Sequence, residues 1–142
     1  MRRRAFLGSA AVAASAALAG CLGSGSLSRG DYDIGMSSNA FQPAEYTVTV
    51  GETVVWGNPN SRAHSVTAYE NAIPKEAEYF ASGEFDTEQA ARDSWRTERG
   101  RAGGKIFTGE TYEHTFEVPG EYRYFCIPHE VGGMKGTIYV EE

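Results

Sequence analysis

A thiol, an imidazole and a thioether lie close together near the C-terminal end of the chain. They belong to Cys126, His129 and Met134, within the segment CIPHEVGGM. Apolar segments that read as strands flank this segment, and its two glycines allow it to fold back on itself. Such a loop directs the three side chains toward one point. Because thiolate and thioether ligands favour soft Cu(I) and imidazole accepts copper in both oxidation states, the segment predicts a copper site.

A second imidazole must come from a distant part of the chain. His64 is the candidate, because it lies in a turn-rich loop after the strand-like residues 53–56. A sheet can bring it beside Cys126 although 62 residues separate the two (126 minus 64). The predicted donor set is then one thiolate and two imidazoles, with the thioether of Met134 as a weak axial ligand, as in a type 1 copper site.

Each of these residue types is also common in purely structural roles, and zinc is the competing metal. Buried cysteines and methionines often fill cores, while zinc rarely accepts Met and prefers closed sets of Cys and His. The joint arrangement therefore favours copper. His114 shares one face of a predicted strand with Tyr112 and Phe116 and has no ligand spacing around it. We expect His114 to be structural.

The segments that position these ligands have the alternation or the short apolar runs of β-strands. We predict strands over residues 32–36, 46–50, 53–56, 65–69, 112–118, 122–125 and 137–140. Residues 32–36 are expected at a sheet edge, with a bend at Phe41-Gln42-Pro43 leading into the next strand. About eight strands suit a two-sheet sandwich of this size.

Residues 71–104 interrupt the strand rhythm and are too long for an ordinary loop. Asp86, with Gln89 three positions later, predicts the start of a short helix that ends near residues 99–104. A solvated excursion without packing is the alternative. We expect three aromatic residues to pack this helical insertion onto the sandwich: Phe80, Phe85 and Trp95.

Cys126, Pro128, His129 and Met134, with the upstream pattern YTVTVGETVVWGN leading to His64, resemble the plastocyanin-like blue copper proteins. Within that group the chain looks most similar to the halocyanins, small membrane-attached copper proteins of halophilic archaea. The resemblance covers residues 31–142. It implies an all-β, cupredoxin-like Greek-key β-sandwich and one-electron transfer through copper that cycles between Cu(II) and Cu(I), with no catalysis at the metal.

The resemblance also implies roles for single residues. His129 corresponds to the solvent-facing ligand, which is the expected electron port. Pro128 has no N–H and cannot donate to the thiolate. Ser65 stands where Asn is usual, and its hydroxyl is expected to hydrogen-bond across to the Cys126 loop. Phe125 stands where plant members carry Tyr, so the electron route through that side chain is not expected here.

Three other function classes compete with electron transfer, and the first, a purely structural sandwich, would leave the ligand set unexplained. A copper carrier or chaperone would need exposed, exchange-prone ligands, whereas the flanking strands indicate a rigid site. A copper enzyme would need an open coordination position and further imidazoles, and only His114 is left over. The sequence therefore predicts an electron carrier and not an enzyme, with redox proteins of a respiratory or similar chain as partners.

The first twenty residues read as an export signal. Arginines precede an Ala-rich apolar run, residues 5–19, that is too short for a comfortable membrane span. Arg3-Arg4 with the following Phe and Leu resembles a twin-arginine signal. The letters LAGC resemble a lipoprotein cleavage box, which would make Cys21 the new N-terminus and the site of lipid attachment. A plain signal with cleavage nearby is the alternative.

These assignments divide the chain into a signal (1–20), a flexible lipid-anchored tether (21–30) and a copper domain (31–142). They predict an exported protein on the extracytoplasmic face of the cell membrane, anchored through Cys21. Removing the signal removes three arginines, so the net charge changes from 13 minus 19 to 10 minus 19, or −9. This balance argues against nucleic acid as a partner, because phosphates require a basic face.

Overall fold

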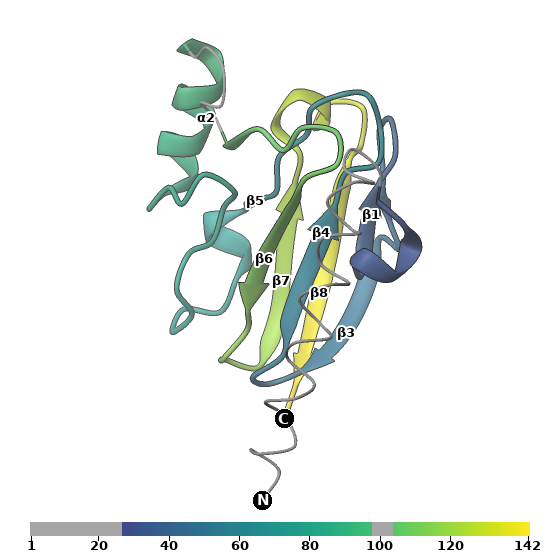
Figure 1. Cartoon of the computed structure of the whole chain (residues 1–142). Coiled ribbons are helices and arrows are strands. Elements are labelled where there is room, and N and C mark those ends of the chain that lie inside the picture. Colours follow the sequence, from purple (N-terminus) through teal and green to yellow (C-terminus); the bar gives the residue numbers. More distant parts are fainter. Residues whose placement is uncertain (1–26, 98–103) are drawn as a thin grey trace, which may run out of the picture.

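The computed structural model describes residues 27–97 and 104–142, and eight strands in this part of the chain form two four-stranded sheets. The first sheet has the order β2-β1-β4-β6 and the second the order β3-β8-β7-β5. The two sheets pack face to face as a sandwich (Figure 1). The predicted all-β fold class with one short helix is therefore confirmed. The signal, most of the tether and Cys21 lie outside the described residues.

Seven of the eight strands overlap the predicted segments, whereas the eighth, Phe41–Gln42, lies where only a bend was predicted. In the first sheet they are Phe41–Gln42 (β2), Ile34–Met36 (β1), Thr53–Gly57 (β4) and Thr111–Thr115 (β6). In the second they are Glu45–Thr49 (β3), Lys135–Glu141 (β8), Gly120–Phe125 (β7) and Thr67–Ala68 (β5). The bend after Gln42 carries the chain from one sheet to the other, because β2 and β3 belong to different sheets.

The expectation that residues 32–36 form an edge strand is wrong. β1 pairs antiparallel with β2 and parallel with β4, so it lies inside its sheet, and all three of its residues are buried. The two-residue strand β2 takes the edge instead. The sequence feature that is compatible with an interior strand is the continuous apolar run Ile34-Gly35-Met36, since a strand covered on both faces lacks polar alternation.

The core between the sheets is built around Trp56, which is fully buried on β4. Its indole lies 6.2 Å from the Phe80 ring and 5.4 Å from the Tyr124 ring, so both sheets and the insertion contribute to one aromatic cluster. His114 belongs to this cluster: its ring stacks on Phe80 at 4.7 Å and meets Phe116 edge-on at 4.8 Å. His114 thus has the structural position predicted for it.

A 3-10 turn, Glu70–Ala72 (η2), leads into the insertion, whose described part contains one α-helix, Glu88–Thr97 (α2). The helix begins one residue later than predicted, because the Thr87 hydroxyl, and not Asp86, accepts from the Ala90 amide at 3.1 Å. Ala91 is buried where α2 lies against β5. No helix in the described part of the chain is long and apolar enough to span a membrane.

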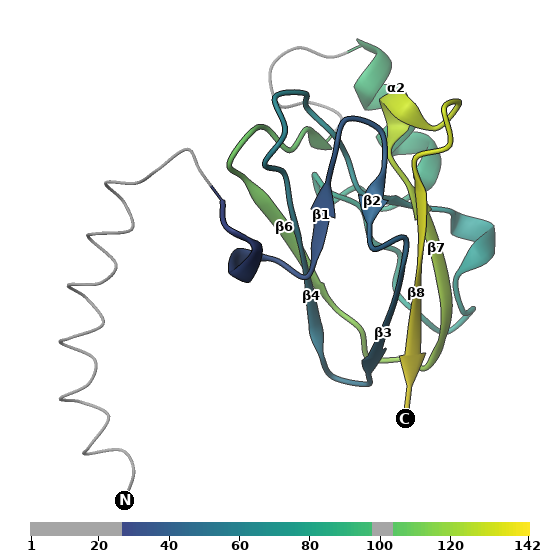
Figure 2. The same cartoon turned by 90° about the vertical axis from the view of Figure 1, so that its right-hand side faces the viewer.

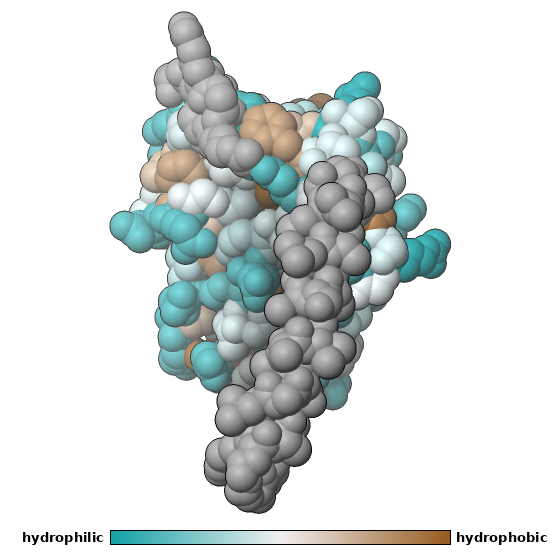
Figure 3. Space-filling model, viewed as in Figure 1, coloured by the Kyte–Doolittle hydropathy of each residue, from teal (hydrophilic) through white to brown (hydrophobic). Residues whose placement is uncertain are grey.

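The predicted packing of the insertion is correct for Phe80 only. Phe80 enters the core cluster, whereas Phe85 and Trp95 stay outside it. The Trp95 ring instead carries the Lys105 ammonium 4.5 Å above its centroid. Hydrophilic residues dominate the face of the molecule that carries α2, with apolar ones scattered among them (Figure 3).

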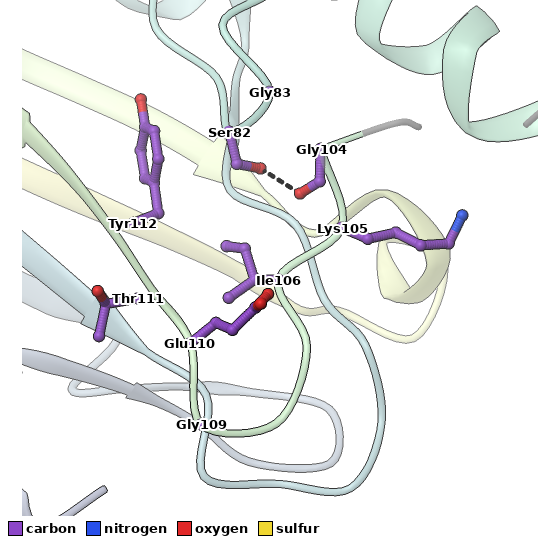
Figure 4. Close-up of a pocket in the computed structure, with 9 residues that line it drawn as sticks. All are labelled: Ser82, Gly83, Gly104, Lys105, Ile106, Gly109, Glu110, Thr111 and Tyr112. Carbon is purple, nitrogen blue, oxygen red and sulfur yellow. Dashed lines mark hydrogen bonds between the residues drawn. The ribbon is translucent and has the colours of Figure 1, made fainter. Parts of the chain in front are cut away.

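Ser82, inside the insertion, meets Gly104, its last residue, at a hydrogen bond. The buried Ser82 hydroxyl donates to the Gly104 carbonyl at 2.8 Å (Figure 4). Gly104 has a φ of +76°, and a Cβ added there would lie 2.0 Å from the Ser82 carbonyl oxygen. Only glycine permits this close approach. We call this contact between Ser82 and Gly104 the clasp.

We expect Gly104→Ala to destabilise the protein more than Gly51→Ala. Gly51 also has a positive φ, +94°, but a Cβ there would meet nothing within 4 Å, so it controls for the backbone penalty alone. The extra cost at Gly104 should be about 1–3 kcal/mol, as for an overpacked core position. Urea unfolding of the two variants measures the difference, and equal losses would contradict the close contact.

Candidate metal centre

The metal loop is the segment from Cys126 to Met134, between β7 and β8. A hydrogen bond from the Cys126 amide to the Met134 carbonyl, 3.0 Å, closes its base, and the Met134 amide bonds to the His129 carbonyl at 3.1 Å. Gly133, with a φ of +95°, makes the return turn by donating to the Glu130 carbonyl at 2.9 Å. The loop lies at the end of the sandwich away from the C-terminus (Figure 1).

His64 is held by a second loop, between β4 and β5. The backbone N–H groups of His64 and Ile106 each donate to the other residue's carbonyl, at 3.2 and 2.8 Å. The fully buried Asn58 side chain donates to the carbonyls of Ile106 and Arg62, at 2.8 and 2.7 Å. Sequence reasoning did not assign Asn58 this part, and the only signal for it is the turn-forming sequence Asn-Pro-Asn.

The structure brings three of the predicted donors together. The Cys126 Sγ lies 3.6 Å from His64 Nδ1 and 3.4 Å from His129 Nδ1, and all three atoms lie within 4.8 Å of one another. Among the described residues this is the only such group of three or more His, Cys, Asp or Glu side chains. Met134 is fully buried, and its backbone is hydrogen-bonded to Cys126 and His129 in the same loop.

This donor set fits copper better than zinc. One soft thiolate and two imidazoles, with a buried thioether at hand, match the ligand preferences of copper in both oxidation states. A closed structural zinc site would need a fourth Cys, His or carboxylate, and the group found in the described residues holds three.

Ser65 joins the two loops. Its backbone N–H donates to the Cys126 Sγ at 3.4 Å, and its hydroxyl accepts from the Ile127 amide at 2.8 Å. The hydrogen bond predicted from Ser65 to the Cys126 loop is therefore present. Pro128 lies in the 3-10 turn Ile127–His129 (η4) and supplies no N–H to the sulfur.

The two imidazoles differ in exposure. His64 is fully buried, whereas His129 is only partly covered. The Arg62 guanidinium lies 3.4 Å from the His129 Nε2. Val131, two residues further along the loop, is fully exposed. His129 is thus the one donor with an edge near solvent.

Burial sets the protonation of the donors in the metal-free protein. It raises the pKa of the Cys126 thiol from 9.0 to about 11, against the opposing effect of backbone hydrogen bonds from Ser65 and His129. It lowers the pKa of His64 from 6.5 to about 4, and nearby positive charge adds to that shift. The pKa of His129 is also lowered, first by burial and then by Arg62. At neutral pH the metal-free site therefore holds a thiol and two uncharged imidazoles.

Arg92 and Glu130 also contact this region, and sequence reasoning missed both. Arg92 lies on α2, and its Nη1 is 2.7 Å from the Glu130 Oε1 in the metal loop. This ion pair is the first cause of the lowered pKa of Glu130. No local pattern links residues 38 positions apart; the only hint was the spacing of Glu88 and Arg92 by four on a predicted helix.

A two-sheet sandwich that carries one thiolate and two imidazoles at one end defines a cupredoxin-type metal-binding protein. The comparisons give the family: residues 30–141 match the model of the copper-binding proteins of the plastocyanin/azurin family. The chain belongs to that family. It is 34% identical over 110 residues to the plastocyanin of Scenedesmus fuscus, covering 76% of this chain and 95% of the relative. It is 30% identical over 143 residues to the chloroplastic plastocyanin of Tetradesmus obliquus, covering 99% and 87%.

Solved structures support the fold. An oxidised mutant amicyanin superposes with a TM-score of 0.55 at 22% identity, covering 81% of this chain and 86% of that one. A reduced mutant amicyanin gives a TM-score of 0.53 at 21% identity, covering 76% and 79%. At these identities the likeness concerns the fold alone.

We expect the stability of the metal-free protein to fall on both sides of neutral pH because of the two buried donors. Below about pH 6.5 the His64 side chain of the unfolded chain is protonated, whereas in the folded chain it stays neutral down to about pH 4. Stability therefore falls as the pH falls through this window. Between about pH 9 and 11 the folded chain keeps the Cys126 proton that the unfolded chain releases, so stability falls as the pH rises. Each unit of pKa shift corresponds to about 1.4 kcal/mol.

Urea unfolding of the metal-free protein across this pH range measures both effects. His64→Gln should flatten the acid side and Cys126→Ala the alkaline side, each relative to the wild type. Profiles that keep both slopes in the two variants would show that other groups cause them.

Proposed function

We propose that this protein is a one-electron carrier built on a single type 1 copper site formed by His64, Cys126, His129 and Met134. The convergence of three donor atoms within 4.8 Å at one end of a rigid sandwich supports this most strongly. Copper held by this set supplies a Cu(II)/Cu(I) couple. The protein's residues hold a geometry that both oxidation states tolerate, so an electron can pass without bond making.

Met134 is the proposed axial ligand. Its side chain is fully buried, and both its backbone groups are hydrogen-bonded within the metal loop, to Cys126 and His129. A thioether in this position binds more weakly than the thiolate and imidazoles and tunes the reduction potential.

His129 is the proposed electron port. It is the one donor that is not buried, and its neighbours Pro128 and Val131 are exposed. An imidazole at such a rim offers a short path from the metal to a docked redox protein. Glu130 beside it is paired with Arg92, which limits free negative charge at the rim.

A copper carrier or chaperone without an electron-transfer role would need ligands that exchange readily. Three of the four proposed ligands, His64, Cys126 and Met134, are fully buried, and hydrogen bonds of Ser65 and Ile106 fix the loops of the first two. This arrangement favours slow metal exchange. An electron carrier therefore accounts for the site better, and the family membership supports a carrier over an enzyme.

For location we propose a halocyanin-type protein anchored to the extracytoplasmic face of the cell membrane through a lipid on Cys21. The twin-arginine pattern and the LAGC box support export and lipidation. The partners would be redox proteins of a respiratory or similar chain at that membrane. The net charge of −9 for the chain after Gly20, 10 minus 19, supports proteins over nucleic acid as partners.

We expect the copper-loaded protein to show an intense thiolate-to-Cu(II) absorption band in the visible range that disappears on reduction. Cys126→Ala should abolish the band because it removes the thiolate. His114→Phe is the control: it removes a histidine that lies in the aromatic core, so the band should stay. A colourless Cu(II) protein, or one that takes up zinc and rejects copper, would contradict the proposal.

We expect the native protein to fractionate with membranes and to carry a lipid mass on Cys21. One acyl chain gives only reversible binding, so a stable anchor predicts two chains or a diether-type group. Cys21→Ser should move the protein to the soluble fraction, while Cys126→Ser, which also removes one thiol, should stay with the membrane. Native amounts of the Cys21→Ser protein on the membrane would place the anchor elsewhere.

A further inference from the structure

We infer that helix α2 of the insertion is part of the metal site's scaffold, and that Arg92 is a positioning residue which holds His129 in place through Glu130. The inference rests on the proposed function for its spectroscopic readout, but its first test needs no metal. Figure 2 shows α2 beside the turn of the metal loop that follows β7.

The contact between helix and loop is bidentate. Arg92 Nη1 lies 2.7 Å from Glu130 Oε1, and Arg92 Nη2 lies 3.2 Å from Glu130 Oε2. The two side chains retain 26% and 24% of their exposure, so the pair is largely shielded from water. Isolated exposed pairs contribute little, whereas a shielded fork-to-carboxylate pair fixes both distance and orientation.

Glu130 transmits this restraint to the metal loop. It follows His129 directly, and its backbone carbonyl accepts the Gly133 amide that makes the return turn. The Tyr69 hydroxyl donates to Glu130 Oε2 at 2.6 Å. With both carboxylate oxygens occupied from outside the loop, the turn that carries His129 has one favoured position.

Arg92 also reaches the other side of the site. Its guanidinium lies 4.3 Å from the centroid of the Phe125 ring, and Phe125 directly precedes Cys126. Tyr69 stacks on the same ring at 4.4 Å. Arg92 of the insertion therefore contacts both Phe125, which precedes Cys126, and Glu130, which follows His129.

The helix is itself anchored, so Arg92 acts from a fixed base. Glu88 Oε2 accepts from Arg92 Nε at 2.9 Å, within one turn of the helix. The backbone N–H groups of Glu88 and Glu70 each donate to the other's carboxylate, at 3.0 and 2.9 Å. These bonds tie the start of α2 to η2, which follows β5.

His129 is the donor that needs such support. His64 and Cys126 are fully buried and held by packing, whereas His129 is partly exposed on a turn with exposed glycines. Fixing a ligand within fractions of an ångström requires contacts beyond the ligands themselves. The contacts among Arg92, Glu130, Tyr69 and Phe125 supply this support for His129.

The test compares Arg92→Gln with Arg96→Gln. Arg96 lies on the same helix and pairs only with Asp93 at an exposed position among the contacts described, so its loss controls for charge and for helix content. In the metal-free protein, amide hydrogen exchange of residues 129–134 should become about tenfold faster in Arg92→Gln and stay unchanged in Arg96→Gln. Glu130→Gln, which leaves α2 untouched, should reproduce the effect of Arg92→Gln.

The copper-loaded variants give a second readout. Arg92→Gln and Glu130→Gln should both broaden the thiolate absorption band, and the double variant should broaden it no more than either single one. Arg92→Lys should show a smaller change than Arg92→Gln without reaching wild-type behaviour, because an ammonium cannot form the bidentate pair.

Unchanged exchange in Arg92→Gln, or equal acceleration in Arg96→Gln, would overturn the inference. So would a Glu130→Gln protein that behaves as the wild type. If the wild-type protein lacks the thiolate–copper band, the proposed function fails, while the exchange rates of the metal-free proteins still decide whether Arg92 holds the loop.

Discussion

The bridge that Ser65 makes between two loops is the constraint on which the site depends. His64 follows a strand of one sheet and Cys126 follows a strand of the other, so nothing in the chain's local order brings them together. The pairing of β5 with β7 sets their relative height, since Thr67 lies opposite Phe125. The Ser65 amide and hydroxyl then fix the remaining freedom by bonding to the Cys126 sulfur and the Ile127 amide. A slip of one residue in that register would turn the donors away from each other.

The metal-free site carries a cost that the metal offsets. Burying a thiol and an imidazole disfavours their charged forms, as the raised pKa of Cys126 and the lowered pKa of His64 show. Binding a cation here would require the loss of one proton at neutral pH, from the Cys126 thiol, because the imidazoles are already neutral. The same burial that destabilises the charged thiol keeps water from the sulfur and fixes its neighbours.

Sequence reasoning recovered what local chemistry encodes. The four proposed ligands, the hydrogen bond of Ser65 and the structural place of His114 follow from residue types, spacing and resemblance. It failed where long-range packing decides. The apolar run of β1 was compatible with an interior strand, but its parallel partner β4 is set by long-range packing that the local sequence does not encode. Arg92 and Glu130 meet only because α2 folds back over the metal loop, and Trp95, the more obvious packing residue, lies on Lys105 instead.

The clasp between Ser82 and Gly104 closes the base of the segment that lies between these two residues. Because Ser82 and Gly104 are joined by a buried hydrogen bond, the separation of the strands on either side does not depend on how many residues lie between these two. The entropy of closing a loop grows only with the logarithm of its length, so such a segment can lengthen or shorten with little effect on the sandwich. Evolution is then free to vary the excursion, as long as a glycine stays at its base. The turn of α2 that contacts the metal loop must keep its position. The segment therefore combines a variable length with one fixed contact.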